Sequence, residues 1–254
     1  MASNPSGYLI DIGTLHRNDF EALWEQERKQ NPHLQHIEQI YQAGTLPSEK
    51  GEAISIFPGA IELQDAKILY TLARKMHPKI TVETGFGYGM SAWTFLAAHA
   101  ATGSDAHHIA IDPFYPHWTQ SVGKLHLEKQ SFSGFHLLEH NALVALPHLI
   151  SEGLLQDLCL AFIDGSHLFE QAMVDFCMLD HMLVEGGILV LDDAHAPAIE
   201  TLLNYIEANR QEYRIRRDFS PIAILQKRGP DERSWSHFVP FQSASSHQWP
   251  TRKK

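Results

Sequence analysis

The stretch Ile80–Thr94, ITVETGFGYGMSAWT, determines the fold that we predict for this chain. It begins with a β-branched run that ends at the acid Glu83, and it continues through three glycines at alternate positions, Gly85, Gly87 and Gly89. Residues of good helix propensity follow. We interpret the stretch as a buried strand, a tight turn whose missing side chains let a ligand approach the backbone, and a helix N-terminus. Such a unit binds a nucleoside-bearing cofactor at the carboxyl end of a parallel sheet.

The spacing of the glycines helps to distinguish a dinucleotide-binding turn from other cofactor-binding turns. A dinucleotide fingerprint needs Gly-x-Gly-x-x-Gly, but here the third glycine comes one residue early and Met90 occupies the final position. Glu83 would also repel a pyrophosphate. The pattern E-x-G-x-G-x-G after a strand resembles the first motif of class I S-adenosylmethionine (SAM) methyltransferases. In that family the glycine turn passes under the amino-acid and sulfonium end of the cofactor. The resemblance therefore implies that Glu83, Gly85, Gly87 and Gly89 bind SAM.

Strands and helices alternate along most of the chain. We expect five near-continuous apolar strands, at 80–84, 108–112, 135–139, 158–163 and 187–192. We expect helices at 61–76, 89–101, 119–130, 142–152, 168–183 and 197–210, followed by a hairpin of Tyr213–Phe219 and Ile222–Gln226. Apolar strands joined by helices predict a parallel sheet that is covered on both faces. The fold class is therefore α/β, with a Rossmann-like, seven-stranded, mostly parallel sheet and a C-terminal antiparallel hairpin. This layout is similar to that of the SAM methyltransferase family over residues 55–228.

The same pattern divides the chain into three parts. Residues 1–60 form an N-terminal helical cap or oligomerisation segment, with two helices in the range 14–44. Residues 61–228 form the SAM-binding methyltransferase domain. Residues 229–254, rich in Ser, Pro, His and Lys with isolated aromatic residues, form a tail that we expect to be flexible or to lie on a partner. The family resemblance implies that the N-terminal helices supply the cap over the substrate.

Polar residues that end the middle strands are candidate cofactor ligands, because ligands of such sheets bind beyond the carboxyl ends of the strands. Asp112 ends the second strand and is followed by Pro113 and Phe114. Its carboxylate can accept hydrogen bonds from both ribose hydroxyls, and the aromatic ring can lie on the adenine face; the alternative is a turn aspartate before proline. Asn141, after the third strand, resembles the residue that the family places near the adenine amino group, and a helix cap is its alternative.

Three aspartates end the fourth and fifth strands. Asp164 lies in FIDGSH, and Asp192 and Asp193 lie in LVLDDAH. Clustered carboxylates repel one another unless a cation neutralises them, and hard oxygen ligands suit Mg²⁺ or another divalent cation. The arrangement resembles the metal site of small-molecule O-methyltransferases, in particular catechol O-methyltransferase-like enzymes and bacterial macrolide-sugar O-methyltransferases. It implies that all three aspartates bind the metal and that Asp164 also lies against the cofactor.

Two histidines next to these acids are candidate catalytic bases. His167 stands where the catechol enzymes carry a lysine base, and His195 is its rival as base, metal ligand or substrate contact. A metal that binds two neighbouring hydroxyls lowers the pKa of one of them, and an imidazole can remove the proton near neutral pH. The oxygen then attacks the SAM methyl group. Because a histidine stands in place of that lysine, the resemblance does not imply a strictly catechol-type acceptor.

Composition limits the partners. A formal net charge of −10 disfavours nucleic acid, and no apolar run approaches the roughly 20 residues of a membrane span. The N-terminus lacks the layout of a signal peptide, and Cys159 and Cys177 lie in apolar stretches that are typical of buried thiols in a reducing compartment. We therefore expect a cytoplasmic protein that acts on a small hydroxylated molecule, such as a sugar, polyketide or phenolic compound, without nucleic acid or membrane. A homo-oligomer through the N-terminal helices or the tail stays open.

Three other functions remain as alternatives. A catalytically inactive SAM-binding or scaffold protein would keep the fold and bind acceptors without turnover. A nicotinamide-dependent oxidoreductase would need the dinucleotide spacing and a hydride-site pair, neither of which the sequence contains. A hydroxylase would need a redox-metal triad, which is also not evident.

Overall fold

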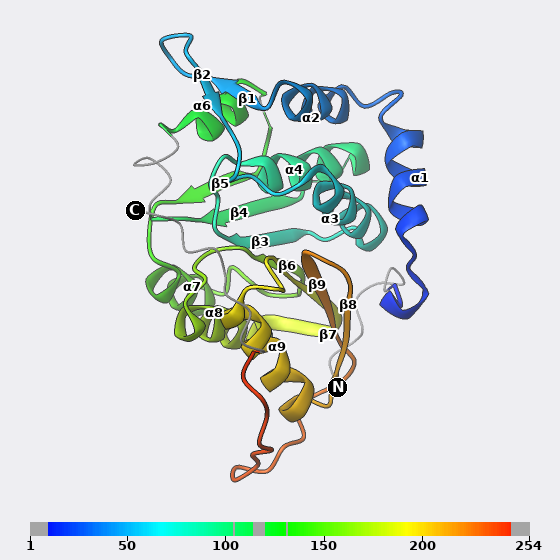
Figure 1. The fold of residues 1–254 in the computed structure, drawn as a ribbon, viewed down its shortest axis with the longest axis vertical. Helices are drawn as coiled ribbons and strands as arrows, with labels where there is room; N and C mark the ends of the chain where they lie inside the picture. The colour runs from blue at the N-terminus through cyan, green and yellow to red at the C-terminus, as the bar shows by residue number, and fades with distance from the viewer. Residues whose placement is uncertain (1–9, 104, 114–119, 131, 245–254) are drawn as a thin grey trace.

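A computed structural model of the chain describes residues 10–103, 105–113, 120–130 and 132–244. Seven strands form one sheet in the order β5–β4–β3–β6–β7–β9–β8 (Figure 1). β9 pairs antiparallel with β7 and β8, and the other neighbours are parallel. The strands of this sheet are β3 (Ile80–Thr84), β4 (His107–Ile111), β5 (Phe135–Leu138), β6 (Leu158–Ile163), β7 (Leu183–Leu191), β8 (Tyr213–Phe219) and β9 (Ile222–Lys227). The predicted fold class is confirmed.

Helices cover both faces of this sheet (Figure 1). One face carries α1 (Arg17–Glu27), α2 (Pro32–Ala43), α3 (Leu63–Met76), α4 (Met90–Thr102) and α6 (Val122–Lys129). The other carries α7 (Ala142–Ser151), α8 (Phe169–Met182) and α9 (Pro197–Asn209). Successive side chains of a strand point to opposite faces. On β6, Leu160 and Phe162 therefore enter the first core and Ala161 and Ile163 enter the second, which is why the strand is apolar throughout.

The N-terminal helices belong to the same hydrophobic core as the sheet. Phe20 and Trp24 of α1 are completely buried. The ring of Phe20 meets the edge of Phe219 on β8 with 5.3 Å between centroids, and Trp24 meets Tyr70 of α3 at 5.4 Å. Burial of such large side chains stabilises the fold by roughly 2–3 kcal/mol each. The α1 and α2 segment is therefore held firmly against α3.

A segment before α1 ties the N-terminal region to the far edge of the sheet. The side-chain amide of Gln226 on β9 donates to the carbonyl of Ile10 at 2.5 Å. The guanidinium of Arg216 on β8 donates to the carbonyl of Ile12 at 2.6 Å, and Ile12 starts a short 3-10 helix, Ile12–Thr14. These bonds join residues that are more than 200 positions apart.

The connection between α2 and α3 contains a small hairpin that the sequence did not predict. Its strands are β1 (Thr45–Pro47) and β2 (Ala53–Ser55), which pair antiparallel. Strands of three residues are too short to show an alternating pattern, and a proline inside a run counts against a strand, so no strand was predicted between residues 44 and 61. From β2 the chain returns to α3 through residues 56–62.

The described part of the predicted tail, residues 229–244, lies against α9 of the same chain. The backbone N–H of Val239 donates to Asn209 Oδ1 at 2.7 Å, and Asn209 Nδ2 donates back to the Val239 carbonyl at 2.9 Å. Phe241 meets Tyr205 edge-on with 5.5 Å between ring centroids. Asn209 is a polar residue near the end of an amphipathic helix, and nothing in its sequence context indicates this contact.

The expectation of two buried thiols is wrong for Cys177, which is exposed, whereas Cys159 is partly buried; both are free. On α8 the buried residues include Phe176 and Leu179. A step of one residue turns a helix by about 100°, so Cys177 points away from the core although its neighbours in sequence are apolar. Among the described residues, no helix combines the length and the apolar character that a membrane crossing requires.

Candidate active site

A cavity of about 760 Å³ opens at the carboxyl ends of β3, β4, β6 and β7. It is lined by the glycine turn after β3, by the residues that follow the other three strands, and by segment 58–62 together with Asp65 of α3. Parallel strands bring their carboxyl ends to one edge of the sheet, so residues far apart in sequence meet there. Most of the predicted site residues lie at this edge.

The glycine turn is shaped by the close approach of β6. Gly85 has φ +90°, and a Cβ atom at this position would lie 2.0 Å from the carbonyl oxygen of Asp164. Only glycine fits there. Gly85 and Gly87 line the cavity. Gly89, with φ +76°, is instead the N-cap of α4 and is not among the lining residues.

Asp112 holds the glycine turn from the neighbouring strand. It follows β4 directly, and its Oδ2 atom accepts hydrogen bonds from the backbone N–H groups of Phe86 and Gly87, both at 3.0 Å. The side chain is buried and lines the cavity together with Pro113. Phe114, predicted to cover the adenine, lies outside the described residues. Sequence reasoning placed Asp112 at the cavity but did not foresee that it fixes the turn.

Glu83 does not reach the cavity. Because Val82 points toward α7–α9, the next side chain points toward α3 and α4, and the Glu83 carboxylate is completely buried there. Its Oε1 atom lies 3.4 Å from Nε2 of His108, and neither carboxylate oxygen has a hydrogen-bond partner among the described residues. The alternation of the strand turns this carboxylate away from the cavity. The contact between Glu83 and the cofactor stays a prediction.

Asn141 is a helix cap, one of the two roles considered for it, and it also lies at the cavity. It lines the cavity, and it is the N-cap of α7, where its Oδ1 atom accepts the backbone N–H of Leu143 at 2.8 Å. The cap fixes the side chain at the cavity rim, which leaves its amide nitrogen as a donor.

The three strand-end aspartates meet at one side of the cavity together with His167. Nε2 of His167 lies 2.8 Å from Oδ2 of Asp193, and Nε2 of His195 lies 4.0 Å from Oδ1 of the same residue. One donor atom each of Asp164, His167 and Asp193 lies within 4.8 Å of the others. Asp192 lies beside this group, and its buried Oδ1 atom has no hydrogen-bond partner among the described residues.

The electrostatics of this cluster disfavour full ionisation. Burial raises the pKa of the Asp192 carboxyl to about 6, with the charge of Asp193 acting in the same direction. Burial and the charge of Asp192 hold the pKa of Asp164 well above its usual range. Carboxyl groups that repel one another in this way are stabilised by a bound cation.

Two further acids of the cavity wall were missed from the sequence. Asp65, in the first turn of α3, is buried; its Oδ2 atom accepts the Glu62 N–H at 3.1 Å. Burial, followed by the charge of Asp192, raises the pKa of Asp65 to about 8. Asp175 of α8 is also buried and accepts a hydrogen bond from Gln171 at 2.9 Å. The signal that could have revealed them is an acid within the apolar face of an amphipathic helix.

Comparison with known proteins fits this geometry. Residues 82–194, from β3 through the acidic pair after β7, match a family model described as a methyltransferase domain. This part of the chain is therefore similar to a methyltransferase domain. The matched residues include the glycine turn, Asp112, Asn141 and the three clustered aspartates. A search of curated protein sequences found no significant match.

Solved methyltransferase structures share the fold at low identity. A methyltransferase of Podospora anserina with bound S-adenosylhomocysteine (SAH) is 14% identical, with 87% of this chain and 100% of that chain covered and a TM-score of 0.56. The SAH complex of an O-methyltransferase from Bacillus cereus is 13% identical, with 84% and 100% covered and a TM-score of 0.57. A TDP-rhamnose 3′-O-methyltransferase of calicheamicin biosynthesis is 16% identical, with 76% and 92% covered and a TM-score of 0.50. These likenesses concern the methyltransferase fold.

Proposed function

We propose that this protein transfers the methyl group of SAM to a hydroxyl oxygen of a small hydroxylated acceptor, with assistance from a divalent cation. The observation that carries the proposal is the contact between the two halves of the cavity. The glycine turn packs directly on the backbone of Asp164, and the side chain of Asp164 belongs to the cluster with His167 and Asp193. A cofactor on the turn and an acceptor at the cluster would therefore be neighbours.

The cofactor half of the cavity suits SAM better than a dinucleotide. Asp112 is placed beside the turn, where a carboxylate can accept hydrogen bonds from ribose hydroxyls. The cofactor carries a positive sulfonium, which the nearby carboxylates favour, whereas a pyrophosphate would be repelled. The SAH-bound structures that share this fold point in the same direction.

The residues of the acidic cluster suit a divalent cation. Asp164, Asp192 and Asp193 would hold it through carboxylate oxygens, the donors that Mg²⁺ prefers. The partnerless, buried Oδ1 atom of Asp192 supports this assignment, because a cation would satisfy it. When bound, such a cation lowers the pKa of a coordinated hydroxyl group.

We propose His167 as the base. Its Nε2 atom lies 2.8 Å from the Asp193 carboxylate, which can accept the Nε2–H and orient the ring. In this orientation Nδ1 would be the atom that takes a proton from the acceptor hydroxyl. The acceptor oxygen then forms a bond to the methyl carbon as the bond from carbon to sulfur breaks, and SAH leaves. His195 is the alternative base, in which case His167 would serve as a third metal donor.

The site and the shared fold support the acceptor class that we propose. A cavity with a carboxylate cluster and an imidazole at one end suits neighbouring hydroxyl groups, such as those of a sugar, polyketide or phenolic compound. The O-methyltransferases of the same fold are in keeping with oxygen as the methylated atom. We also propose that the partners are small molecules rather than nucleic acid or membrane, in line with the net charge of −10.

Calorimetric titration of SAH tests the proposal, first with Mg²⁺ and then with EDTA. We expect micromolar binding and a higher midpoint of thermal unfolding when Mg²⁺ is present. The matched variants are Asp192→Asn, which should lose the stabilisation by Mg²⁺, and Asp157→Asn, which removes an exposed aspartate outside the cavity and should keep it. No SAH binding under either condition would refute the methyltransferase activity. Binding of SAH without turnover of any hydroxylated acceptor would favour a scaffold.

A further inference from the structure

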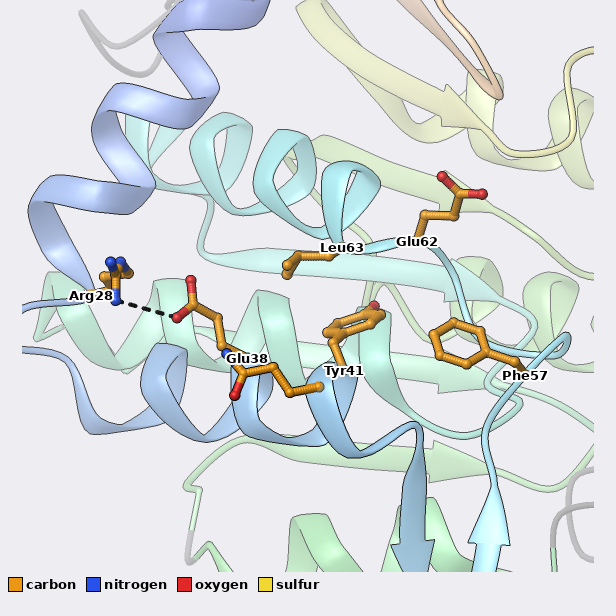
Figure 2. A pocket seen from close by; sticks show the side chains of 7 residues that line it. Arg28, Glu38, Tyr41, Phe57, Glu62 and Leu63 are labelled. Atoms are coloured by element: carbon orange, nitrogen blue, oxygen red, sulfur yellow. Dashed lines mark hydrogen bonds and ion pairs between the residues drawn. The ribbon is translucent and has the colours of Figure 1, made fainter.

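A second cavity, of about 680 Å³, lies on the side of the N-terminal helices (Figure 2). Its walls come from the end of α1, from one face of α2 and from segment 57–63. Nothing in the chemistry described above uses this cavity. It is nevertheless next to the first cavity, which segment 58–62 lines.

The two cavities share a wall. Glu62 lines both of them. The Tyr41 hydroxyl donates a hydrogen bond to the carbonyl of Ile61 at 2.9 Å; Tyr41 lines the second cavity and Ile61 lines the first. Phe57 and Pro58 are consecutive residues that line the second and the first cavity, respectively. A single backbone segment, residues 57–62, therefore separates the two cavities. A ligand that passes over Glu62 would occupy both cavities.

Aromatic faces form one side of the second cavity. The rings of Tyr41 and Phe57 have their centroids 6.2 Å apart and are inclined by 43° (Figure 2). Phe57 is 44% exposed, which is high for a large apolar side chain. Exposed aromatic rings at the edge of a cavity provide flat apolar surface for a ligand with a flat apolar face.

Fixed polar groups form the opposite side. The Glu38 carboxylate accepts hydrogen bonds from Trp24 Nε1 at 2.7 Å and from the Arg28 guanidinium at 3.4 Å. Arg28 also pairs with Glu25 at 2.8 Å, so two carboxylates already neutralise its charge. This arrangement disfavours an anionic ligand such as a phosphate. Carboxylate, guanidinium and the amide of Gln42 together supply acceptors and donors that match hydroxyl groups.

We infer that the second cavity binds a neutral pyranose ring, and that the acceptor is a glycosylated small molecule whose reacting hydroxyl lies in the first cavity. A pyranose has one apolar face of C–H groups, which suits the Tyr41 and Phe57 rings, and a rim of hydroxyls, which suits Glu38 and Gln42. The pairing of the two cavities in one substrate rests on the proposed function. The binding of a sugar ring to the second cavity does not depend on it.

Saturation-transfer NMR on the full-length protein tests the inference directly. The probes are p-nitrophenyl β-D-glucopyranoside and p-nitrophenyl α-L-rhamnopyranoside, each at millimolar concentration. We expect transfer to the sugar ring protons of at least one probe with the wild-type protein. Phe57→Ala and Gln42→Ala should each weaken this binding. The loss of the aromatic ring in Phe57→Ala should raise the dissociation constant by about five-fold. Leu154→Ala removes a similarly exposed apolar side chain (52%) outside both cavities and should leave it unchanged.

Two results would overturn the inference: no transfer to either glycoside with the wild-type protein, or binding that Phe57→Ala and Gln42→Ala leave intact. Circular dichroism confirms that each variant is folded, and Gln42, an exposed side chain, provides a variant with little risk to the fold. A titration of SAH on the same sample separates the two proposals. Binding of SAH without binding of either glycoside refutes the sugar subsite and the glycosylated acceptor but not the methyltransferase activity. Binding of a glycoside without SAH refutes the methyltransferase activity and the pairing of the two cavities but not the sugar subsite.

Discussion

The backbone at Gly85 approaches the carbonyl oxygen of Asp164 so closely that a Cβ atom would lie 2.0 Å from it. This contact sets the depth of the glycine turn below the cofactor side of the cavity. It also brings the chain segment that carries the acidic cluster next to the turn. A substitution at Gly85 should therefore affect both halves of the site.

Gly85→Ala should lower the free energy of unfolding by about 2–4 kcal/mol and reduce the affinity for SAH by at least about ten-fold, because the strand ends must separate. Gly51→Ala is the matched control. Gly51 also has a positive φ, +81°, but a Cβ there meets nothing within 4 Å among the described residues. It should cost about 1 kcal/mol from backbone strain alone and leave SAH binding unchanged. Urea unfolding and calorimetry measure the two quantities, and equal losses in both variants would contradict the close approach.

Asp112→Ala should loosen the glycine turn. It removes the Oδ2 atom that accepts the N–H groups of Phe86 and Gly87, and an unpaired buried donor costs about 1–3 kcal/mol. We expect reduced stability in urea and weaker binding of SAH. Asp112→Asn keeps one oxygen that can accept from the same N–H groups, so its stability should fall between those of the wild type and Asp112→Ala. A wild-type stability for Asp112→Ala would show that these bonds do not hold the turn.

His167→Ala should reduce kcat by about 100-fold or more if the imidazole removes the proton of the acceptor. The dissociation constants for SAH and Mg²⁺ should stay as in the wild type. His148→Ala, at an exposed position of α7 outside the cavity, is the control. A loss of Mg²⁺ affinity in His167→Ala, with kcat recovered at high Mg²⁺, would instead make His167 a metal ligand and His195 the base.

Asp65→Asn should change how stability depends on pH. The folded-state pKa of Asp65 is raised from 3.8 to about 8, so the folded protein holds a proton that the unfolded chain releases at lower pH. The contribution of the protonated Asp65 carboxyl to the free energy of unfolding is fully present below pH 4 and is lost as the pH rises toward 8. The neutral amide avoids that loss, so the variant should exceed the wild type by about 1–3 kcal/mol near pH 8 and match it near pH 4. Urea unfolding at both pH values, without added Mg²⁺, measures the difference in stability between the variant and the wild type. The same difference at both pH values would show that Asp65 is ionised at neutral pH.

The sequence predicted the parts of the fold that depend on local pattern. The apolar strands, the helices between them and the edge at which Asp112, Asp164 and Asp193 meet all follow from alternation and from the rule that parallel strands end together. The orientation of Glu83 does not, because its position at the strand end agrees with either face until the register of β3 against β4 is known. Asp65 was missed for a related reason: whether a helix turns an acid inward depends on what the helix packs against.

The hydrogen bonds from Gln226 and Arg216 to residues 10 and 12 also have a consequence for how the protein is made. The partners are separated by almost the whole chain, so during synthesis on the ribosome residues 10 and 12 cannot form these bonds until β8 and β9 have been made. Contacts that close so large a loop carry a high entropic cost and form late. Until then Phe20 lacks its partner Phe219, and the nascent chain carries α1 with an uncovered apolar face. A newly made molecule can therefore bring its central strands together before the helices that wall the second cavity are anchored.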